Sequence, residues 1–141
     1  MELYEYTVHE LVEKLEKGEV TSVEITKSYF DRIKEIDPKV KAYVSTMEEE
    51  AMAKAKEVDE KRKAGEKVSA LAGIPIGIKD NMCITGTKTT CSSKMLENFV
   101  APYDATVMNK INAEEMINLI TEFTNGNSRL FSFSPSISPL H

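Results

Sequence analysis

The sequence predicts an α/β fold in which helices come first and the strands of a mixed sheet follow. Three observations support this prediction. Residues 1–64 contain three segments with apolar residues at helical spacing. Residues 71–79 alternate isoleucine with other residue types, as a strand does. The chain has 141 residues and 41% hydrophobic content, which is sufficient for one domain with its own core.

Each of the three predicted helices is preceded by a threonine with a glutamate three residues later. In such a capping box the threonine hydroxyl accepts a hydrogen bond from the amide three residues later, and the glutamate side chain accepts one from the amide of the threonine. The three boxes begin at Thr7, Thr21 and Thr46. The first helix is expected to end at Gly18, and its apolar stripe comprises Val8, Leu11, Val12 and Leu15.

The second predicted helix ends at Pro38, because proline lacks the amide that continues a helix. Its apolar stripe comprises Ile25, Tyr29, Ile33 and Ile36. A short extended piece follows at residues 41–45. The third helix is expected over residues 47–64, up to Gly65, with a narrow apolar side and a solvated face of Glu and Lys pairs. The narrow side comprises Ala51, Ala55 and Val58.

In the predicted strand, one face carries isoleucine and the other is nearly bare up to Lys79. Pro75 cannot donate a ladder bond and Gly77 has no side chain, while the isoleucine face comprises Ile74, Ile76 and Ile78. Residues 85–93 are rich in Thr and Ser and are expected to form a loop. Asp104 is expected to cap a last helix with the apolar stripe Val107, Met108 and Ile111.

Charge and composition argue against several classes of function. The net charge of −5 argues against a protein that mainly binds phosphate backbones. No long apolar run or signal peptide is visible, so we expect a cytoplasmic protein without a membrane partner. Two cysteines and two histidines make a poor metal set, so neither a metal site nor a disulfide is expected; these residues are Cys83, Cys91, His9 and His141.

Two interpretations of Lys79 remain open from the residues alone. A lysine at a strand end can simply reach water along apolar surface. Alternatively, burial disfavours the charged form of a lysine and lowers its pKa, and a neutral amine can accept a proton from a hydroxyl nucleophile. Serine–lysine pairs are an accepted variant of the serine triad.

The run LAGIPIGIKDNMCITGTKTTCSSKMLENFVAPYDATV, residues 71–107, resembles the opening of the amidase signature family. GIPIGIKDN is typical of the wider family, whereas TTCSSKMLENFVAPYDATV favours one branch, the A subunits of the glutamyl-tRNA(Gln) amidotransferases. The resemblance extends over residues 5–110. It implies that the chain is the N-terminal part of that fold, a large mixed sheet with helices on both faces.

The resemblance also implies a chemistry. Family members cleave a carboxamide with a serine nucleophile, a second serine in a cis peptide bond and a lysine base, which by position is Lys79. Ile76 and Ile78 are then expected to keep the amine dry. In the amidotransferase branch, ammonia from glutamine passes to partner subunits B and C, which use ATP and Mg²⁺ to convert Glu-tRNA(Gln) to Gln-tRNA(Gln). This implies no cofactor on the present chain and only indirect contact with tRNA.

The sequence departs from the family pattern in two places. The Gly/Ser-rich stretch with the two catalytic serines is not present, and Ser92 and Ser93 match an upstream loop, where their hydroxyls are expected to bond backbone groups. The helical spacing breaks near Asn112, where a second stripe points elsewhere; it comprises Met116, Leu119, Ile120 and Phe123. We therefore expect residues 1–111 to be the N-terminal part of an amidase domain and residues 112–141 to be a divergent, irregular tail, for which a frame change or truncation near codon 112 is one hypothesis.

The expected function is that of a truncated amidotransferase A subunit, inactive alone because the serines are missing. Two alternatives remain. The chain is a fragment of a different amidase that hydrolyses small carboxamides, or it is a non-catalytic binding module whose first two helices dock a partner.

Overall fold

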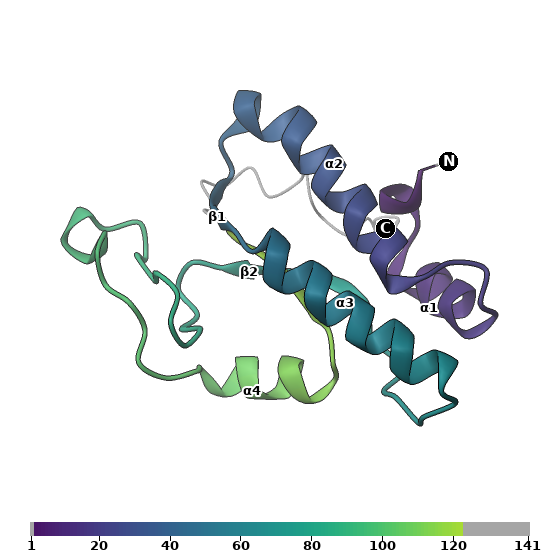
Figure 1. Cartoon of the computed structure of the whole chain (residues 1–141). Helices are drawn as coiled ribbons and strands as arrows, with labels where there is room; N and C mark the ends of the chain where they lie inside the picture. The colour runs from purple at the N-terminus through teal and green to yellow at the C-terminus, as the bar shows by residue number, and fades with distance from the viewer. Residues whose placement is uncertain (1, 123–141) are drawn as a thin grey trace, which may run out of the picture.

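The computed structural model describes residues 2–122 of the chain, and Figure 1 shows their arrangement. The structure begins with a short 3-10 helix, η1, and a second one, η2, lies in the long segment after β2. The elements in chain order are η1 (Leu3–Glu5), α1 (Val8–Glu16), α2 (Ser22–Val40), β1 (Tyr43–Thr46), α3 (Glu48–Lys63), β2 (Pro75–Lys79), η2 (Lys94–Leu96), α4 (Thr106–Ala113) and β3 (Ile117–Glu122).

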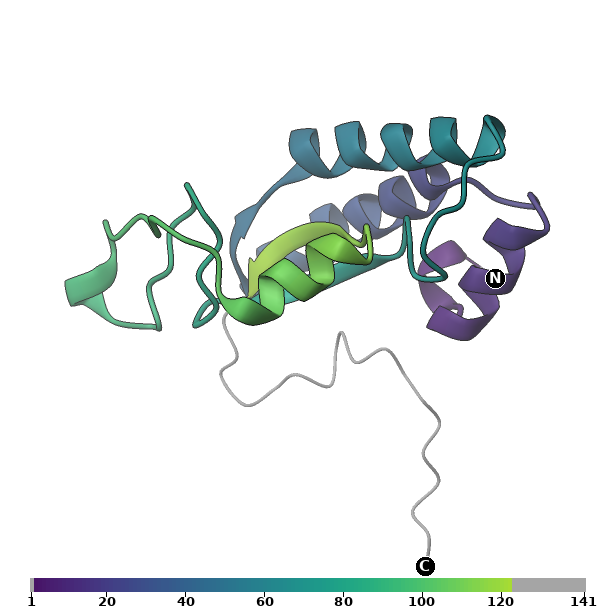
Figure 2. The same cartoon turned by 90° about the horizontal axis from the view of Figure 1, so that it is seen from below.

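The described strands form one mixed sheet in the order β1-β3-β2. β1 runs antiparallel to β3, and β2 runs parallel to it. Helices α2 and α3 cover one face of this sheet and α4 lies on the other, as the two views in Figures 1 and 2 agree. The predicted α/β class with a mixed sheet is confirmed.

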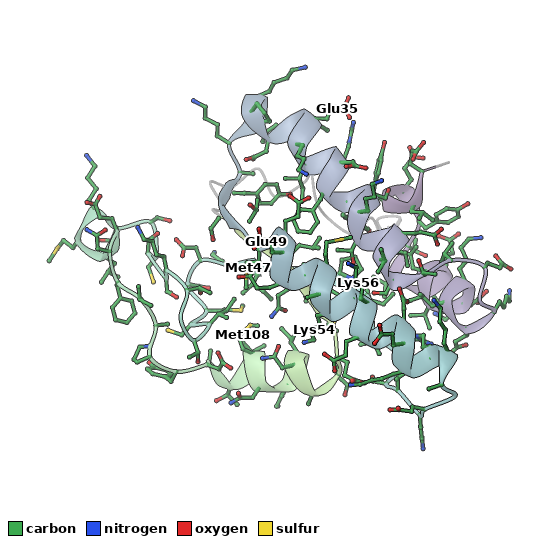
Figure 3. All side chains as sticks on the ribbon, viewed as in Figure 1. Glu35, Met47, Glu49, Lys54, Lys56 and Met108 are labelled. Carbon is green, nitrogen blue, oxygen red and sulfur yellow. The ribbon has the colours of Figure 1, made fainter. Side chains whose placement is uncertain are left out.

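The core divides along these layers. The cluster between α2, α3 and the sheet comprises Phe30, Ile33, Ala51, Ala55, Val58, Ala72, Ile117 and Leu119. A second cluster joins α1 to α2 and to the start of β2; it comprises Leu11, Leu15, Ile25 and Ile74. The third lies under α4, where Met108 points from the helix toward the sheet (Figure 3) and packs with Ile78 and Ile84.

Two of the three predicted capping boxes are confirmed. The Thr7 hydroxyl accepts the amide of Glu10 at 3.3 Å, and the Glu10 carboxylate accepts the amide of Thr7 at 2.8 Å. Thr21 and Glu24 form the same pair of bonds. The prediction for Thr46 is wrong, because this residue ends β1 opposite Ile120 and the helix begins after it, at Glu48.

The predicted end of the second helix at Pro38 is also wrong. α2 continues to Val40, and the chain turns at Lys41, which has the left-handed φ of 52°. Asp37 accounts for the later end: its backbone oxygen accepts the Lys41 amide at 2.7 Å and its carboxylate accepts the Ala42 amide at 2.8 Å. The predicted breaks at Gly18 and Gly65 are confirmed by their positive φ angles of 70° and 74°.

The expected cap of the last helix is replaced by a different contact. α4 begins at Thr106 after Ala105, which makes no side-chain cap. The carboxylate of Asp104 instead accepts the amide of Thr85 at 2.7 Å, a residue that lies in the loop after β2. Met108 is buried in the stripe of this helix, whereas Val107 is exposed.

The expected boundary at residue 111 does not match the structure. It falls inside α4, and β3, the central strand of the described sheet, lies beyond it. The spacing of Met116, Leu119 and Ile120 resembles a helical stripe, but Ile117 and Leu119 alternate toward the core as strand residues do. The regular structure therefore extends at least to Glu122, and the remaining part of the expected tail, residues 123–141, lies outside the described residues.

Candidate functional site

Lys79 is the last residue of β2 and its side chain is exposed. Ile76 and Ile78, on either side of Gly77, contact the cluster under α4. Because successive side chains of a strand point to opposite faces, Lys79 points toward the face that α2 and α3 cover. The expectation that Ile76 and Ile78 keep this amine dry is therefore wrong: they lie on the opposite face.

The start of β2 is fixed by a buried polar contact between three elements. The carboxylate of Asp59, on α3, accepts the amides of Ser22 and Val23 at 2.8 and 3.0 Å, which caps the first turn of α2. The Ser22 hydroxyl donates to the backbone oxygen of Gly73 at 2.8 Å. This contact holds the segment that leads into β2 against both helices. It therefore fixes the position of the start of β2, the strand that ends at Lys79.

Gly73 is required at this contact for two reasons. Its φ of +84° lies in the left-handed region that favours glycine, and a Cβ added there would lie 2.8 Å from the Ser22 hydroxyl oxygen. Gly73 also donates its amide to the backbone oxygen of Glu115, just before β3. Sequence patterns do not single out Asp59, Ser22 and Gly73, because their contacts join residues that are 36 to 51 positions apart.

On the other side of Lys79 the chain is held by Asp80. This residue is only 3% exposed, and its carboxylate accepts both the amide of Thr90, at 2.8 Å, and the Thr90 hydroxyl. Its backbone oxygen accepts the amide of Cys91 at 3.0 Å. Lys79 therefore lies between a paired strand and an anchored turn, so its backbone position is defined while its side chain reaches solvent.

The residues that follow include backbone conformations uncommon for their side chains. Cys91 and Ser92 have positive φ angles of 48° and 61°. Such conformations often cluster at functional sites, where the surrounding structure holds them in place. In this chain, the bond from the Cys91 amide to Asp80 fixes this turn next to the end of β2.

Ser93 behaves as the sequence analysis expected. Its hydroxyl accepts the amide of Met95 at 3.3 Å and so caps η2. For Ser92, the structure gives a contact of the backbone only, since its amide donates to the Thr90 hydroxyl oxygen at 3.3 Å.

Residues 80–105 form a long excursion between β2 and α4, which we call the arm. Its two halves pair through backbone bonds from Gly86 to Ala101, from Ala101 to Thr87 and from Thr89 to Phe99. In both Figure 1 and Figure 2 the arm extends away from the helices and the sheet. It buries few side chains of its own, among them Ile84 and Ala101.

A charged cluster on α3 supports the fold. Lys61 pairs with Glu115 at 2.5 Å and with Glu57 at 2.9 Å. The hydrogen bonds to Glu115 and Glu57 raise the pKa of Lys61, and the bond to Lys61 lowers the pKa of Glu57. Partial burial lowers the pKa of Lys54, two turns earlier on α3 (Figure 3). The cluster ties α3 to the turn before β3.

Neither metal-binding clusters nor membrane helices occur in the part of the chain that the structure describes. Residues 2–122 contain no group of three or more His, Cys, Asp or Glu side chains arranged to hold a metal ion. No helix among these residues combines the length and the apolar character needed to cross a bilayer.

Comparison with known proteins places the chain in a family. The Amidase family model matches residues 24–123, which is most of the chain. Curated relatives, named as A subunits of glutamyl-tRNA(Gln) amidotransferase, include one from Thermoanaerobacter pseudethanolicus, 53% identical over 132 residues, and one from Chlamydia pneumoniae, 42% identical over 142 residues. These matches cover 91% and 97% of this chain but only 27% and 29% of the relatives. The chain therefore spans little more than a quarter of their length.

The similarity also extends past residue 111. Because residues 112–141 are 30 of 141 residues, a match over 91% of the chain must include part of them. This agrees with the position of β3 in the centre of the described sheet.

Solved structures show the same fold. The peptide amidase of Stenotrophomonas maltophilia is 27% identical, with a TM-score of 0.75, over 82% of this chain and 24% of that protein. A fatty acid amide hydrolase, 20% identical, shares the fold with a TM-score of 0.79 over 85% of this chain and 21% of its own.

Proposed function

The chain belongs to the amidase family, and from this premise we propose that it is the N-terminal part of the glutamine-hydrolysing A subunit of a glutamyl-tRNA(Gln) amidotransferase. The observation that carries the proposal is the position of Lys79. It ends a strand of the amidase fold, its backbone is held on both sides, and its amine is accessible. The names of relatives that are 42–53% identical support the amidotransferase over other amidases.

Lys79 would act as a general base. With its Nζ neutral, it accepts a proton from a bridging serine hydroxyl, which in turn accepts the proton of a second serine as this attacks the amide carbon of glutamine. The proton then returns to the departing nitrogen, which leaves as ammonia. The fold fixes the backbone at the end of β2, so only the side-chain rotamer of Lys79 has to be selected to place the amine.

The other components would come from elsewhere in the complex. We propose that partner subunits B and C receive the ammonia and use ATP and Mg²⁺ to amidate Glu-tRNA(Gln). This chain would then need no cofactor of its own and would meet tRNA only indirectly.

The 141 residues alone would not hydrolyse glutamine. An exposed Lys79 lacks the two serine hydroxyls through which it would act, and it lacks the surrounding wall that would exclude water. The apolar stripes of α1 and α2 do not favour the alternative of a helical docking module, because Leu11, Leu15 and Ile25 are buried in the core of the chain itself.

Two preparations test the proposal: the chain alone, and residues 1–122 joined to the following part of the Thermoanaerobacter relative. We expect no ammonia release from glutamine by the chain alone above the level of its Lys79→Ala variant, and clear release by the joined protein. Hydrolysis by the chain alone at a rate that Lys79→Ala abolishes would contradict the inactivity of the separate chain. A joined protein that folds but leaves glutamine intact would contradict the glutaminase role.

A different amidase remains a second candidate, since the peptide amidase shares this fold at 27% identity. The same joined protein separates the two. If it releases ammonia from a peptide with a C-terminal amide faster than from glutamine, the second candidate is favoured.

A further inference from the structure

A cleft of about 440 Å³ lies where α1 and α3 end and α2 begins. Figure 1 shows these three helix ends on its right side. Small-molecule sites have volumes of about 300–1,000 Å³ and combine apolar walls with a few polar groups. The cleft has this character, because Leu15, Val20 and Val68 line it together with the guanidinium of Arg62. Lys79 is not among the lining residues.

Arg62 supplies a hydrogen-bond donor that has no acceptor. Its Nη2 donates to the backbone oxygen of Ala72 at 3.0 Å, in the segment that leads into β2. Its Nε is buried and has no hydrogen-bond partner within residues 2–122, and no carboxylate of these residues forms an ion pair with it. A buried donor without an acceptor costs free energy. An acceptor that enters the cleft therefore gains a bond that the described part of the chain does not make.

The other charged groups of the cleft are balanced or already in use. The carboxylate of Asp59 accepts two amides at the start of α2, at 2.8 and 3.0 Å, so its charge is satisfied by that helix end. The rim carries two lysines and two glutamates, all exposed, whose charges cancel: Lys17, Lys63, Glu16 and Glu66. The unmatched group is thus the Arg62 guanidinium, and one negative charge is sufficient to match it.

We propose that this cleft binds a small molecule or peptide end that carries one carboxylate next to a short apolar group. The carboxylate accepts the Nε–H of Arg62, a charge-assisted bond of the kind that is about twice as strong as a neutral one. The apolar group packs against Val20 and Val68, which are both partly exposed. A phosphate group fits less well, because it leaves these apolar walls uncovered and brings a second negative charge close to Glu16 and Glu66.

The test is an NMR titration of the full 141-residue chain with N-acetyl-leucine. N-acetyl-leucine amide is the matched probe, since it has the same apolar group and no carboxylate. The sequence contains only three arginines, Arg32, Arg62 and Arg129, so their Nε–H signals can be resolved individually. We expect the acid to shift the Arg62 signal with a Kd on the order of 1 mM. The amide should bind about tenfold more weakly or worse.

Variants separate the two parts of the site. Arg62→Gln should weaken binding of the acid by about tenfold or more. Arg32→Gln is the control, because it removes a guanidinium of α2 that lies over the Tyr4 ring, and it should leave binding unchanged. Since Arg62→Gln also loses the bond to Ala72, circular dichroism checks its fold. Val68→Thr keeps the guanidinium and the shape of the side chain, and should weaken binding by about threefold through lost apolar contact.

Several results would overturn the inference. An unmoved Arg62 Nε–H signal at about 20 mM acid, equal binding of acid and amide, or equal effects of Arg62→Gln and Arg32→Gln would each do so. A shift of the Arg62 signal by inorganic phosphate at the same concentration as by the acid would show general attraction of anions and would overturn the assignment to an apolar carboxylate. None of these readouts involves Lys79 or glutamine, so the outcome is independent of the proposed function.

Discussion

At the scale of single residues, Gly73 and Asp59 hold the segment that leads into β2, as Asp80 holds the chain just after Lys79. The Asp59 carboxylate satisfies two amides of α2, and Gly73 brings the chain within reach of Ser22 before β2 begins. Without this carboxylate, the buried amide of Ser22 and the part-buried amide of Val23 would each lose their hydrogen-bond partner, which is costly away from water. The contact between Asp59, Ser22 and Gly73 thus helps to position Lys79 without touching it.

Gly73→Ala should destabilise the chain far more than Gly18→Ala. Both glycines have a positive φ, so alanine is strained at either position by about 1 kcal/mol. At Gly18 a Cβ meets nothing within 4 Å, whereas at Gly73 it meets the Ser22 side chain at 2.8 Å and Val58 at 3.2 Å. We expect Gly73→Ala to lower the free energy of unfolding by about 2 kcal/mol more than Gly18→Ala does. Urea denaturation of the two variants measures the difference. Equal losses of stability would show that Ser22 and Val58 move away from the new Cβ at no cost in free energy.

At the scale of elements, local signals were predictable and distant partners were not. The boxes at Thr7 and Thr21 lie within four residues of sequence, so the helix starts could be predicted from the sequence. Thr46 and Asp104 carry similar local signals, but Thr46 pairs with β3, and the Asp104 carboxylate accepts a hydrogen bond from the amide of Thr85, 19 residues away. A long-range bond replaced the local one in both cases.

The candidate site follows the same division. The strand that ends at Lys79 could be predicted from its alternating isoleucines. The sequence left open whether the Lys79 side chain is exposed or buried, because this depends on which helices cover the sheet. The anchor at Asp80 was missed for the same reason, since its partner Thr90 is ten residues away.

Asp80→Ala should free the arm near Lys79 while leaving the other end of the arm intact. The Thr90 amide donates to the Asp80 carboxylate, so we expect its hydrogen exchange to accelerate, by about tenfold for the loss of a bond worth about 1.4 kcal/mol. Asp104→Ala is the matched control, because it should accelerate the Thr85 amide instead. Exchange measured by NMR resolves both amides, and acceleration of Thr85 rather than Thr90 in Asp80→Ala would show that the arm is not anchored at two separate points.

At the scale of the whole molecule, the ion pairs predict how stability depends on pH. The pKa of Glu57 is lowered by its bond to Lys61, and the pKa of Glu19 is lowered by its bond to Lys14, both from 4.5. A lowered carboxyl pKa stabilises the fold above the unfolded value, and this contribution is lost as the pH falls through the folded value. The raised pKa of Lys61 contributes below 10.5 and is lost as the pH rises through its folded value.

We therefore expect a plateau of thermal stability between about pH 5 and pH 10, with a decline on either side. Melting followed by circular dichroism across this range measures it. Lys61→Met should reduce the alkaline decline and shrink the acid one, because it removes the partner of both Glu57 and Glu115. A melting temperature that rises on acidification below pH 4.5 would contradict the assignment of these pairs.

The whole molecule also explains why an exposed lysine is compatible with a catalytic role. The chain spans 27% of the Thermoanaerobacter relative. Lys79 lies at the end of β2, whose second edge has no strand beside it in the described sheet, and the arm that follows carries exposed apolar side chains. In the proposed role, further protein would cover these features. Burial of Lys79 by that protein would disfavour the charged form of the amine, as a proton acceptor needs.

The most direct measurement is the rate of ammonia release from glutamine by residues 1–122 joined to the remainder of the Thermoanaerobacter relative, with Lys79 present or replaced. Lys79→Ala removes the amine, and Lys79→Arg keeps a positive charge on a side chain that does not give up its proton near neutral pH. If Lys79 accepts the proton, both variants should fall by about a thousandfold, while the arginine variant keeps the fold and the charge. Retention of most of the rate by Lys79→Arg would show that the residue supplies charge rather than proton transfer, and would contradict the proposed role.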